Sequence, residues 1–100
     1  MISDEEKGII LDIIKRNIPL CDVLLFGSRY KGTNRAASDV DLAIVSPELL
    51  SIFELATLKE DFMNSDLPMR ADIVEYNAVS DSFKKCIDEG NIKIYNGREK

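Results

Sequence analysis

Histidine and tryptophan are both absent from this sequence of 100 residues. Without histidine, the chain cannot form a Ser-His-Asp or Cys-His catalytic group, and it cannot form a zinc site that needs imidazole ligands. Any acid–base or metal chemistry of this chain must therefore depend on carboxylates.

Cysteines and long apolar runs are also scarce. The two cysteines, Cys21 and Cys86, are too few for a disulfide scaffold or a four-cysteine zinc site. Each has mostly apolar neighbours, so we expect both to be reduced and to serve as packing residues. No apolar run approaches the roughly 18 residues of a membrane span, and the first residues lack the pattern of a signal peptide. We expect a cytoplasmic protein with no membrane partner.

Acidic residues outnumber basic ones, 18 against 13, which gives a formal net charge of −5. A chain of this charge gains little from counterion release, so stable nucleic-acid binding is not expected. It can still reach an anionic substrate through metal ions. The hydrophobic fraction of 45% and the charged fraction of 31% are typical of a globular protein, and the length predicts a single domain over residues 1–100.

Helix and strand signals alternate along the chain. Ser3 and Glu6 fit a capping box, and the helix that they begin is expected to end at Pro19. A second long helix is expected to start with Ser46 as N-cap and Pro47 at the first helical position, and a third over residues 79–89.

Strands are expected at 23–26, 40–45, 70–76 and 92–95, with a short helix or turn after the first strand. The order predicts an α/β fold, a small mixed sheet of three to four strands flanked by helices. The helical phenylalanines are expected in the core or at an interface: Phe53, Phe62 and Phe83.

The first informative motif is the run from Phe26 to Gly32, Phe-Gly-Ser-Arg-Tyr-Lys-Gly. Gly27 and Ser28 fall where a strand ends and a helical turn begins, and free N–H groups at such a place suit a phosphate. Gly27 has no Cβ and lets the backbone come close, the Ser28 hydroxyl adds a hydrogen bond, and Arg29 can add positive charge.

The second motif is Ser38-Asp-Val-Asp-Leu42. Asp39 and Asp41 are two residues apart at the entry to a strand, so both carboxylates lie on one face. Two adjacent like charges are costly unless a cation lies between them, and Mg²⁺ prefers such oxygen ligands together with substrate phosphates. Asp72, on a neighbouring predicted strand, supplies a third carboxylate. Three carboxylates can hold two metal ions ~3.5–4 Å apart for in-line phosphoryl transfer.

Each of these signals is weak alone, because Gly-Ser turns and exposed Asp-x-Asp strand ends are common. Together, in this order of elements, they resemble the polymerase-beta-type nucleotidyltransferase superfamily, whose pattern is G-S, a short spacer with G, then S-D-x-D-L and a later strand aspartate. The resemblance is closest to the minimal nucleotidyltransferase family. It covers nearly the whole chain, since residues 72–77, 80–87 and 92–95 also look like the end of such proteins.

The resemblance implies a polymerase-beta-like fold and assigns roles to matching residues. Gly27 and Ser28 match the pair that holds phosphate. Asp39 and Asp41 match the metal-binding pair, and Asp72 matches the third carboxylate, which helps to bind the catalytic ion and can draw the proton from the attacking hydroxyl. The implied cofactor is Mg²⁺, as two ions, and the implied nucleotide is ATP.

The resemblance also implies a partner. Minimal nucleotidyltransferases lack the second domain that clamps the base in larger relatives, and they commonly pair with a HEPN-domain protein. Such pairs look like toxin–antitoxin systems, in which the nucleotidyltransferase neutralises an RNase toxin, in some pairs by transferring AMP from ATP onto it. A Mg²⁺-dependent antitoxin of this kind is the expected function. Two alternatives stay open: a non-catalytic module that masks the HEPN partner, and a small-molecule nucleotidyltransferase.

Overall fold

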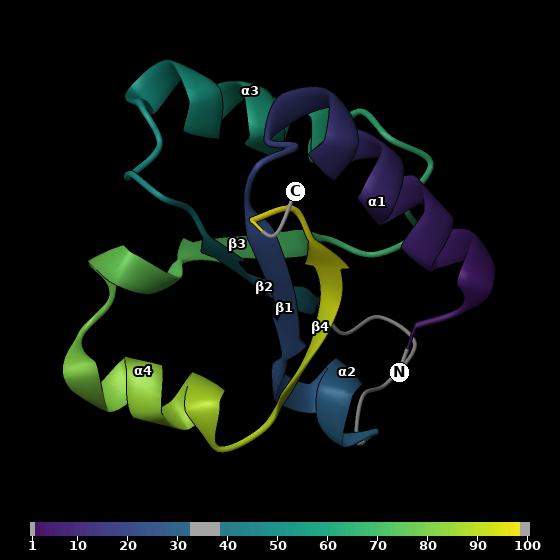
Figure 1. The fold of residues 1–100 in the computed structure, drawn as a ribbon. Helices are drawn as coiled ribbons and strands as arrows, with labels where there is room; N and C mark the ends of the chain where they lie inside the picture. The colour runs from purple at the N-terminus through teal and green to yellow at the C-terminus, as the bar shows by residue number, and fades with distance from the viewer. Residues whose placement is uncertain (1, 33–38, 99–100) are drawn as a thin grey trace.

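We describe the fold from a computed structural model, in which residues 2–32 and 39–98 are described. The element order alternates as the sequence predicts (Figure 1). The helices are α1 (Asp4–Asn17), α2 (Gly27–Lys31), α3 (Ile52–Met63) and α4 (Asp81–Asp88), with a 3₁₀ turn, η1, at Tyr76–Ala78. The strands are β1 (Asp22–Phe26), β2 (Val40–Val45), β3 (Ala71–Glu75) and β4 (Asn91–Asn96).

The four strands form one mixed sheet in the order β3-β2-β1-β4. β1 pairs antiparallel with both β2 and β4, and β2 pairs parallel with β3. Two strands that are distant in the sequence, β2 and β3, therefore start at the same end of the sheet. The predicted α/β class and the predicted mixed sheet are confirmed.

One face of the sheet carries the core. α1 and α3 lie above this face in Figure 1 and pack on each other. Leu42 and Ile44 of β2 point into this layer, where they meet Ile10, Ile14 and Leu58, and all five side chains are fully buried. Because strand side chains alternate between faces, Asp41 and Ala43 of the same strand lie on the opposite face.

The capping box at Ser3 is confirmed. The Ser3 hydroxyl accepts a hydrogen bond from the Glu6 N–H at 3.1 Å, and the Glu6 carboxylate accepts one from the Ser3 N–H at 2.8 Å. The two bonds satisfy donors that a helix start otherwise leaves free. α1 ends at Asn17, just before Pro19, as predicted.

The predicted start of the second long helix is wrong. α3 begins at Ile52 with Ser51, not Ser46, as N-cap. Ser51 and Glu54 form the capping box, with bonds of 3.1 and 3.0 Å, and the Leu50 N–H donates to Glu75 Oε1 at 2.7 Å. A complete capping box at Ser51 outweighs the Ser-Pro signal, and the contact with Glu75 is one that local sequence cannot reveal.

The expectation for the cysteines is half right. Both are free, and Cys21 is buried, but Cys86 is exposed on α4. Among the helical phenylalanines, Phe62 is buried, whereas Phe53 is 85% exposed.

None of the helices in residues 2–32 and 39–98 combines the length and the apolarity that a membrane crossing requires.

Candidate active site

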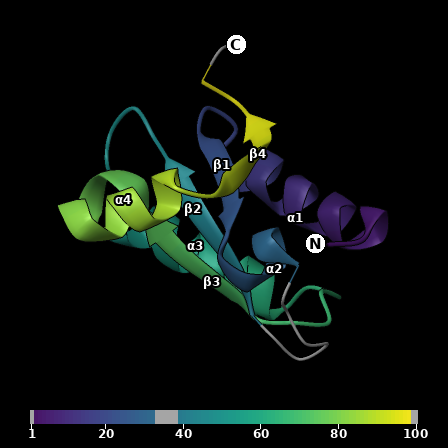
Figure 2. The ribbon, with the colours of Figure 1, turned by 90° about the horizontal axis from the view of Figure 1, so that it is seen from below.

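The site residues lie on the sheet face opposite α1 and α3. Figure 2, which views the molecule from below, shows the ribbons of α4 and α2 on this side, with parts of β2 and β3 between them. Asp41 of β2 is half-buried here, and Asp72 of β3 is exposed. The two are direct register partners in the parallel pair, so their side chains leave the sheet side by side. Asp39, just before β2, is exposed.

The carboxylates of Asp72 and Asp39 act electrostatically on Asp41. Burial raises the pKa of Asp41, and the nearby negative charges of Asp72 and then Asp39 raise it further. Neighbouring carboxylates disfavour the charged form of a carboxyl group, and a cation between them would favour it. The catalytic and metal-binding roles of the three aspartates stay predictions.

Gly27 fits against Asp41. It lies at the junction of β1 and α2 with a φ of +75°, which L side chains rarely adopt. A Cβ at this position would collide with Asp41 Oδ2 and lie 3.1 Å from Asp41 Cγ. The backbone of the Gly-Ser turn and the Asp41 carboxylate are therefore in close contact only because residue 27 has no side chain.

The other two predicted phosphate-binding residues, Ser28 and Arg29, belong to α2. The Ser28 side chain lies outside the described part of the chain, so its role stays a prediction. Arg29 is in α2 and only 5% exposed. Its positive charge is therefore held near the Gly27 turn but mostly away from solvent, and its predicted contact with phosphate also stays a prediction.

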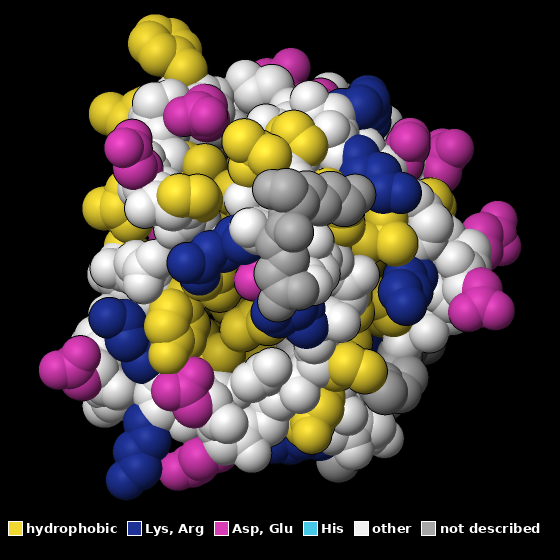
Figure 3. Space-filling model, in the orientation of Figure 1, with side chains coloured by type: hydrophobic (Ala, Val, Ile, Leu, Met, Phe, Trp, Pro, Cys, Tyr) yellow, Lys and Arg dark blue, Asp and Glu magenta, His cyan; other side chains and the backbone are white. Residues whose placement is uncertain are grey.

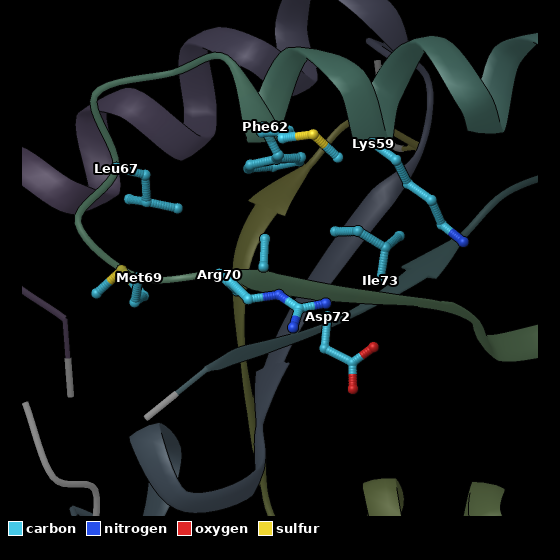
Figure 4. A pocket seen from close by; sticks show the side chains of 9 residues that line it. Lys59, Phe62, Leu67, Met69, Arg70, Asp72 and Ile73 are labelled. Atoms are coloured by element: carbon cyan, nitrogen blue, oxygen red, sulfur yellow. The ribbon is translucent and has the colours of Figure 1, made fainter. Parts of the chain in front are cut away.

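A cavity of about 350 Å³ opens beside Asp72, between α3 and the outer edge of β3. In Figure 4 the Asp72 carboxylate points down from β3, whereas Ile73 points up toward α3. The cations Lys59 and Arg70 and the apolar side chains of Phe62, Leu67 and Met69 also line the cavity. Asp72 therefore lies between the sheet face that carries Asp41 and a cavity lined by two positively charged side chains.

Sequence reasoning missed an aromatic neighbour of the carboxylates. Phe26 is the register partner of Asp41 in the antiparallel pair, so the two side chains share a face. The Phe83 ring of α4 packs edge-on against Phe26, with ring centroids 6.0 Å apart, and Phe83 is 40% exposed. The position of Phe26 directly before Gly27 was the available signal. An aromatic surface therefore borders the carboxylates.

The donor set suits a divalent cation, since it consists of carboxylate oxygens on adjacent strands. Within the described residues, which include all three aspartates, no three His, Cys, Asp or Glu side chains stand close enough together to hold an ion. Asp39 and Asp72 are exposed, and exposed side chains can change rotamer. The residue types and their placement fit a metal ion, provided that these two carboxylates turn toward Asp41.

The sequence matches the family described as "Polymerase beta, Nucleotidyltransferase" over residues 9–100. It is 41% identical over 86 residues to a Haemophilus influenzae protein named a probable protein adenylyltransferase, MntA, a match that covers 86% of this chain and 75% of the relative.

Solved structures share the fold. A toxin–antitoxin complex with AMP-PNP matches with a TM-score of 0.78 and 22% identity, over 93% of this chain and 75% of the other. A complex of tri-AMPylated HEPN toxin with MNT antitoxin from Shewanella oneidensis matches with a TM-score of 0.72 and 19% identity, over 95% and 73%. The predicted resemblance is confirmed: the chain belongs to the polymerase beta nucleotidyltransferase family.

Proposed function

We propose that this chain is a Mg²⁺-dependent adenylyltransferase that moves AMP from ATP onto a hydroxyl of a HEPN-type partner protein and thereby acts as its antitoxin. Membership of the nucleotidyltransferase family and 41% identity to a protein named an adenylyltransferase support this proposal. Related folds occur in a toxin–antitoxin complex with AMP-PNP and in a complex that contains a tri-AMPylated HEPN toxin.

The observation that carries the proposal is the arrangement of Asp41 between Gly27 and Asp72. Asp41 contacts the Gly27 turn on one side and has Asp72 as its register partner on the other. A nucleotide whose phosphates lie on the Gly27 turn would place them next to both carboxylates. The aligned groups would then hold the α-phosphorus in one position, and orientation supplies much of the rate in such reactions.

Family members generally use a divalent metal ion. In this chain Asp39, Asp41 and Asp72 would hold it, as two Mg²⁺ ions. Bound metal neutralises charge that develops on the phosphate oxygens and on the leaving group.

The transfer forms one bond and breaks one bond. The acceptor hydroxyl oxygen attacks the α-phosphorus of ATP, and the bond from that phosphorus to pyrophosphate breaks. The hydroxyl proton passes to the Asp72 carboxylate, which is exposed and so can reach an acceptor that approaches from outside. The product is an AMP ester of the partner, and pyrophosphate leaves.

Labelling with α-³²P-ATP tests the transfer. With Mg²⁺ and the cognate HEPN-type protein, label should appear on the partner. Asp72→Ala should reduce labelling by roughly 10²- to 10⁴-fold, the usual contribution of a general base. Asp12→Ala is the matched control, because Asp12 is an acid on α1 with a side chain 77% exposed, and it should label like the wild type.

The masking alternative gives a different result. If the partner's RNase activity is blocked equally by wild type and Asp72→Ala, with no label transferred, the chain acts by contact alone and the enzyme proposal is wrong. Nothing in the described residues favours a small-molecule acceptor over a protein.

Calorimetric titration with AMP-PNP tests the metal separately. Binding should be tighter with Mg²⁺ than with EDTA, because Mg²⁺ takes part of its coordination shell from phosphates. Equal affinity in both conditions would contradict a metal-bridged nucleotide site.

The proposal includes three further expectations. A cytoplasmic location agrees with the two free cysteines, since cytoplasmic thiols stay reduced. The net charge of −5 argues against stable nucleic-acid binding. Residues 1–100 form one nucleotidyltransferase domain in this proposal, which the family match over residues 9–100 supports.

A further inference from the structure

Four large apolar side chains are exposed near the start of α3. They belong to residues of the loop after α1, the segment after β2 and the first turn of α3, and we call them the apolar patch: Leu20, 61% exposed; Leu49, 57%; Ile52, 86%; and Phe53, 85%. Figure 3 shows hydrophobic and acidic side chains together at the upper left, over the start of α3 and the segment before it. Contiguous apolar surface on a small protein is typical of an interaction site.

A groove of about 370 Å³ adjoins the apolar patch and includes Leu20 and Leu49 in its lining. Ile18, Pro19, Pro47 and Leu50 supply more apolar lining, and Glu48 and Glu54 are its acidic members. Burial raises the pKa of the Cys21 thiol at the groove, and the negative charge of Glu54 raises it further, while Arg98 acts in the opposite direction. The groove lining is therefore apolar with two acidic side chains, Glu48 and Glu54.

The apolar patch rests on ordered backbone. The Ser51–Glu54 capping box begins the helix that presents Ile52 and Phe53, and Glu75 Oε1 accepts the Leu50 N–H at 2.7 Å. A surface that is already ordered loses little conformational entropy when a partner binds. The exposure of Ile52 and Phe53 is thus built into the fold rather than caused by a loose segment.

The apolar patch lies far from the carboxylates. Asp41 is the second residue of β2, and the strand ends at Val45, just before the groove residues 46–50. At ~3.3 Å per residue, the strand separates Asp41 from the groove by roughly 15 Å. A protein bound at the apolar patch therefore leaves the open sheet face accessible.

We propose that the apolar patch and its groove dock the HEPN-type partner through an apolar segment flanked by Lys or Arg, at a point remote from the transfer site. The proposal rests on the proposed function for the identity of the partner. Charge complementarity selects the occupant, because Glu48 and Glu54 lie beside the apolar patch and attract a basic flank. In a two-fold contact with a second copy, the same acids would face each other, and the chain already carries a net charge of −5.

Calorimetry with the purified HEPN-type protein tests this docking surface. Phe53→Asp should weaken binding by about 10-fold or more, as expected for a central apolar anchor. Glu48→Lys should weaken binding by roughly 3-fold and reduce its dependence on salt, as expected for a charge at the rim. Met63→Asp is the control: it places the same charge on α3 at an apolar residue that is 81% exposed but lies at the other end of the helix. Its affinity should stay within about 2-fold of wild type.

The outcomes separate this inference from the proposed function. If Phe53→Asp binds the partner like wild type, the docking surface is wrong, even if Asp72→Ala abolishes labelling. If Phe53→Asp loses binding but no label is ever transferred, the docking surface is supported and the adenylyltransferase proposal fails. If the chain alone sediments as a dimer that Phe53→Asp makes monomeric, a second copy occupies the apolar patch and the inference is overturned.

Discussion

Asp22 and Asp41 lie at opposite ends of the antiparallel β1–β2 pair and have opposite electrostatic surroundings. Burial alone would raise the pKa of Asp22, but hydrogen bonds from the Arg98 N–H and Lys93 outweigh it and lower the pKa. Burial raises the pKa of Asp41 too, and the negative charges of Asp72 and then Asp39 raise it further. At one end of the pair the acid has partners of opposite charge and a lowered pKa, and at the other end the influences on the acid among the described residues all raise its pKa.

The Asp22 carboxylate has two partners within the chain. The Lys93 ammonium on β4 lies 3.1 Å from Asp22 Oδ2, and the Arg98 N–H donates to Oδ1 at 3.0 Å. Both partners come from the last strand and the residues after it, so Asp22 ties the C-terminal part of the chain to β1. A buried acid with partners stabilises the fold, whereas a group of acids without a cation is typical of functional sites.

Gly27→Ala should have the largest effect on transfer activity, because it disrupts the contact between the Gly27 turn and Asp41. The added Cβ collides with Asp41 and the positive φ is strained, so displacement of the turn should reduce transfer by about 100-fold or more. The backbone strain should also cost about 1–3 kcal/mol of unfolding free energy. Activity assays and urea denaturation would measure the two effects.

Gly32→Ala is the matched control. Gly32 has a φ of +74°, almost that of Gly27, but no atom of the residues that the structure describes lies within 4 Å of the position of its Cβ. It should show the backbone cost without the collision. Equal activity in the two variants would show that the contact with Asp41 is unimportant.

Asp22→Asn should lower the free energy of unfolding by about 1–2 kcal/mol, because a charge-assisted hydrogen bond becomes a neutral one. Asparagine keeps an oxygen that can accept the Arg98 N–H, so the loss isolates the ion pair with Lys93. Urea denaturation at pH 7 measures the change. An unchanged midpoint would mean that Lys93 contributes nothing to stability through Asp22.

Asp41→Asn should have a smaller effect of opposite sign on stability at neutral pH. Removing one of three crowded negative charges relieves repulsion, so the metal-free protein should be unchanged or more stable by up to about 0.5 kcal/mol. Transfer activity should collapse in the same variant. Thermal unfolding in EDTA provides the measurement, and a clear loss of stability there would identify Asp41 as a structural residue.

The pH dependence of folding stability should distinguish Asp22 from Asp41, because their pKa values are shifted in opposite directions. A lowered pKa at Asp22 contributes stability above its unfolded value of about 3.9, and this stability is lost as the pH falls through the lower folded value. A raised pKa at Asp41 has the reverse effect, and its destabilisation grows as the pH rises from about 3.9 through the higher folded value. The effects of Asp22→Asn and Asp41→Asn should therefore both shrink toward zero in acid. A difference that persists at low pH would show that one substitution acts through packing.

Local patterns in the sequence were enough to predict several elements. The Ser3–Glu6 capping box, the bounds of β2 at Val40–Val45 and the helix end before Pro19 all depend on neighbours within a few residues. The prediction that Asp39 and Asp41 share a face is equally local, because it depends on the period of a strand, and it stays a prediction.

The second long helix shows where local patterns mislead. Ser46-Pro47 and Ser51-Glu54 are both good helix starts by sequence, and only the second is used. Glu75, on a different strand, bonds to the Leu50 backbone, and this contact is visible only in the folded chain. A choice between two acceptable local signals is decided by such distant contacts.

The sequence by itself determined the alternation of helices and strands, the absence of imidazole ligands and bases, and the spacing of the Gly27 and Asp41 motifs. Only the tertiary structure decided that Asp72 is the register partner of Asp41, that Phe83 packs on Phe26, and that Phe53 faces outward. The physical reason is that propensity and capping act between close neighbours, whereas strand register and helix packing depend on burying one shared core between segments far apart in the chain.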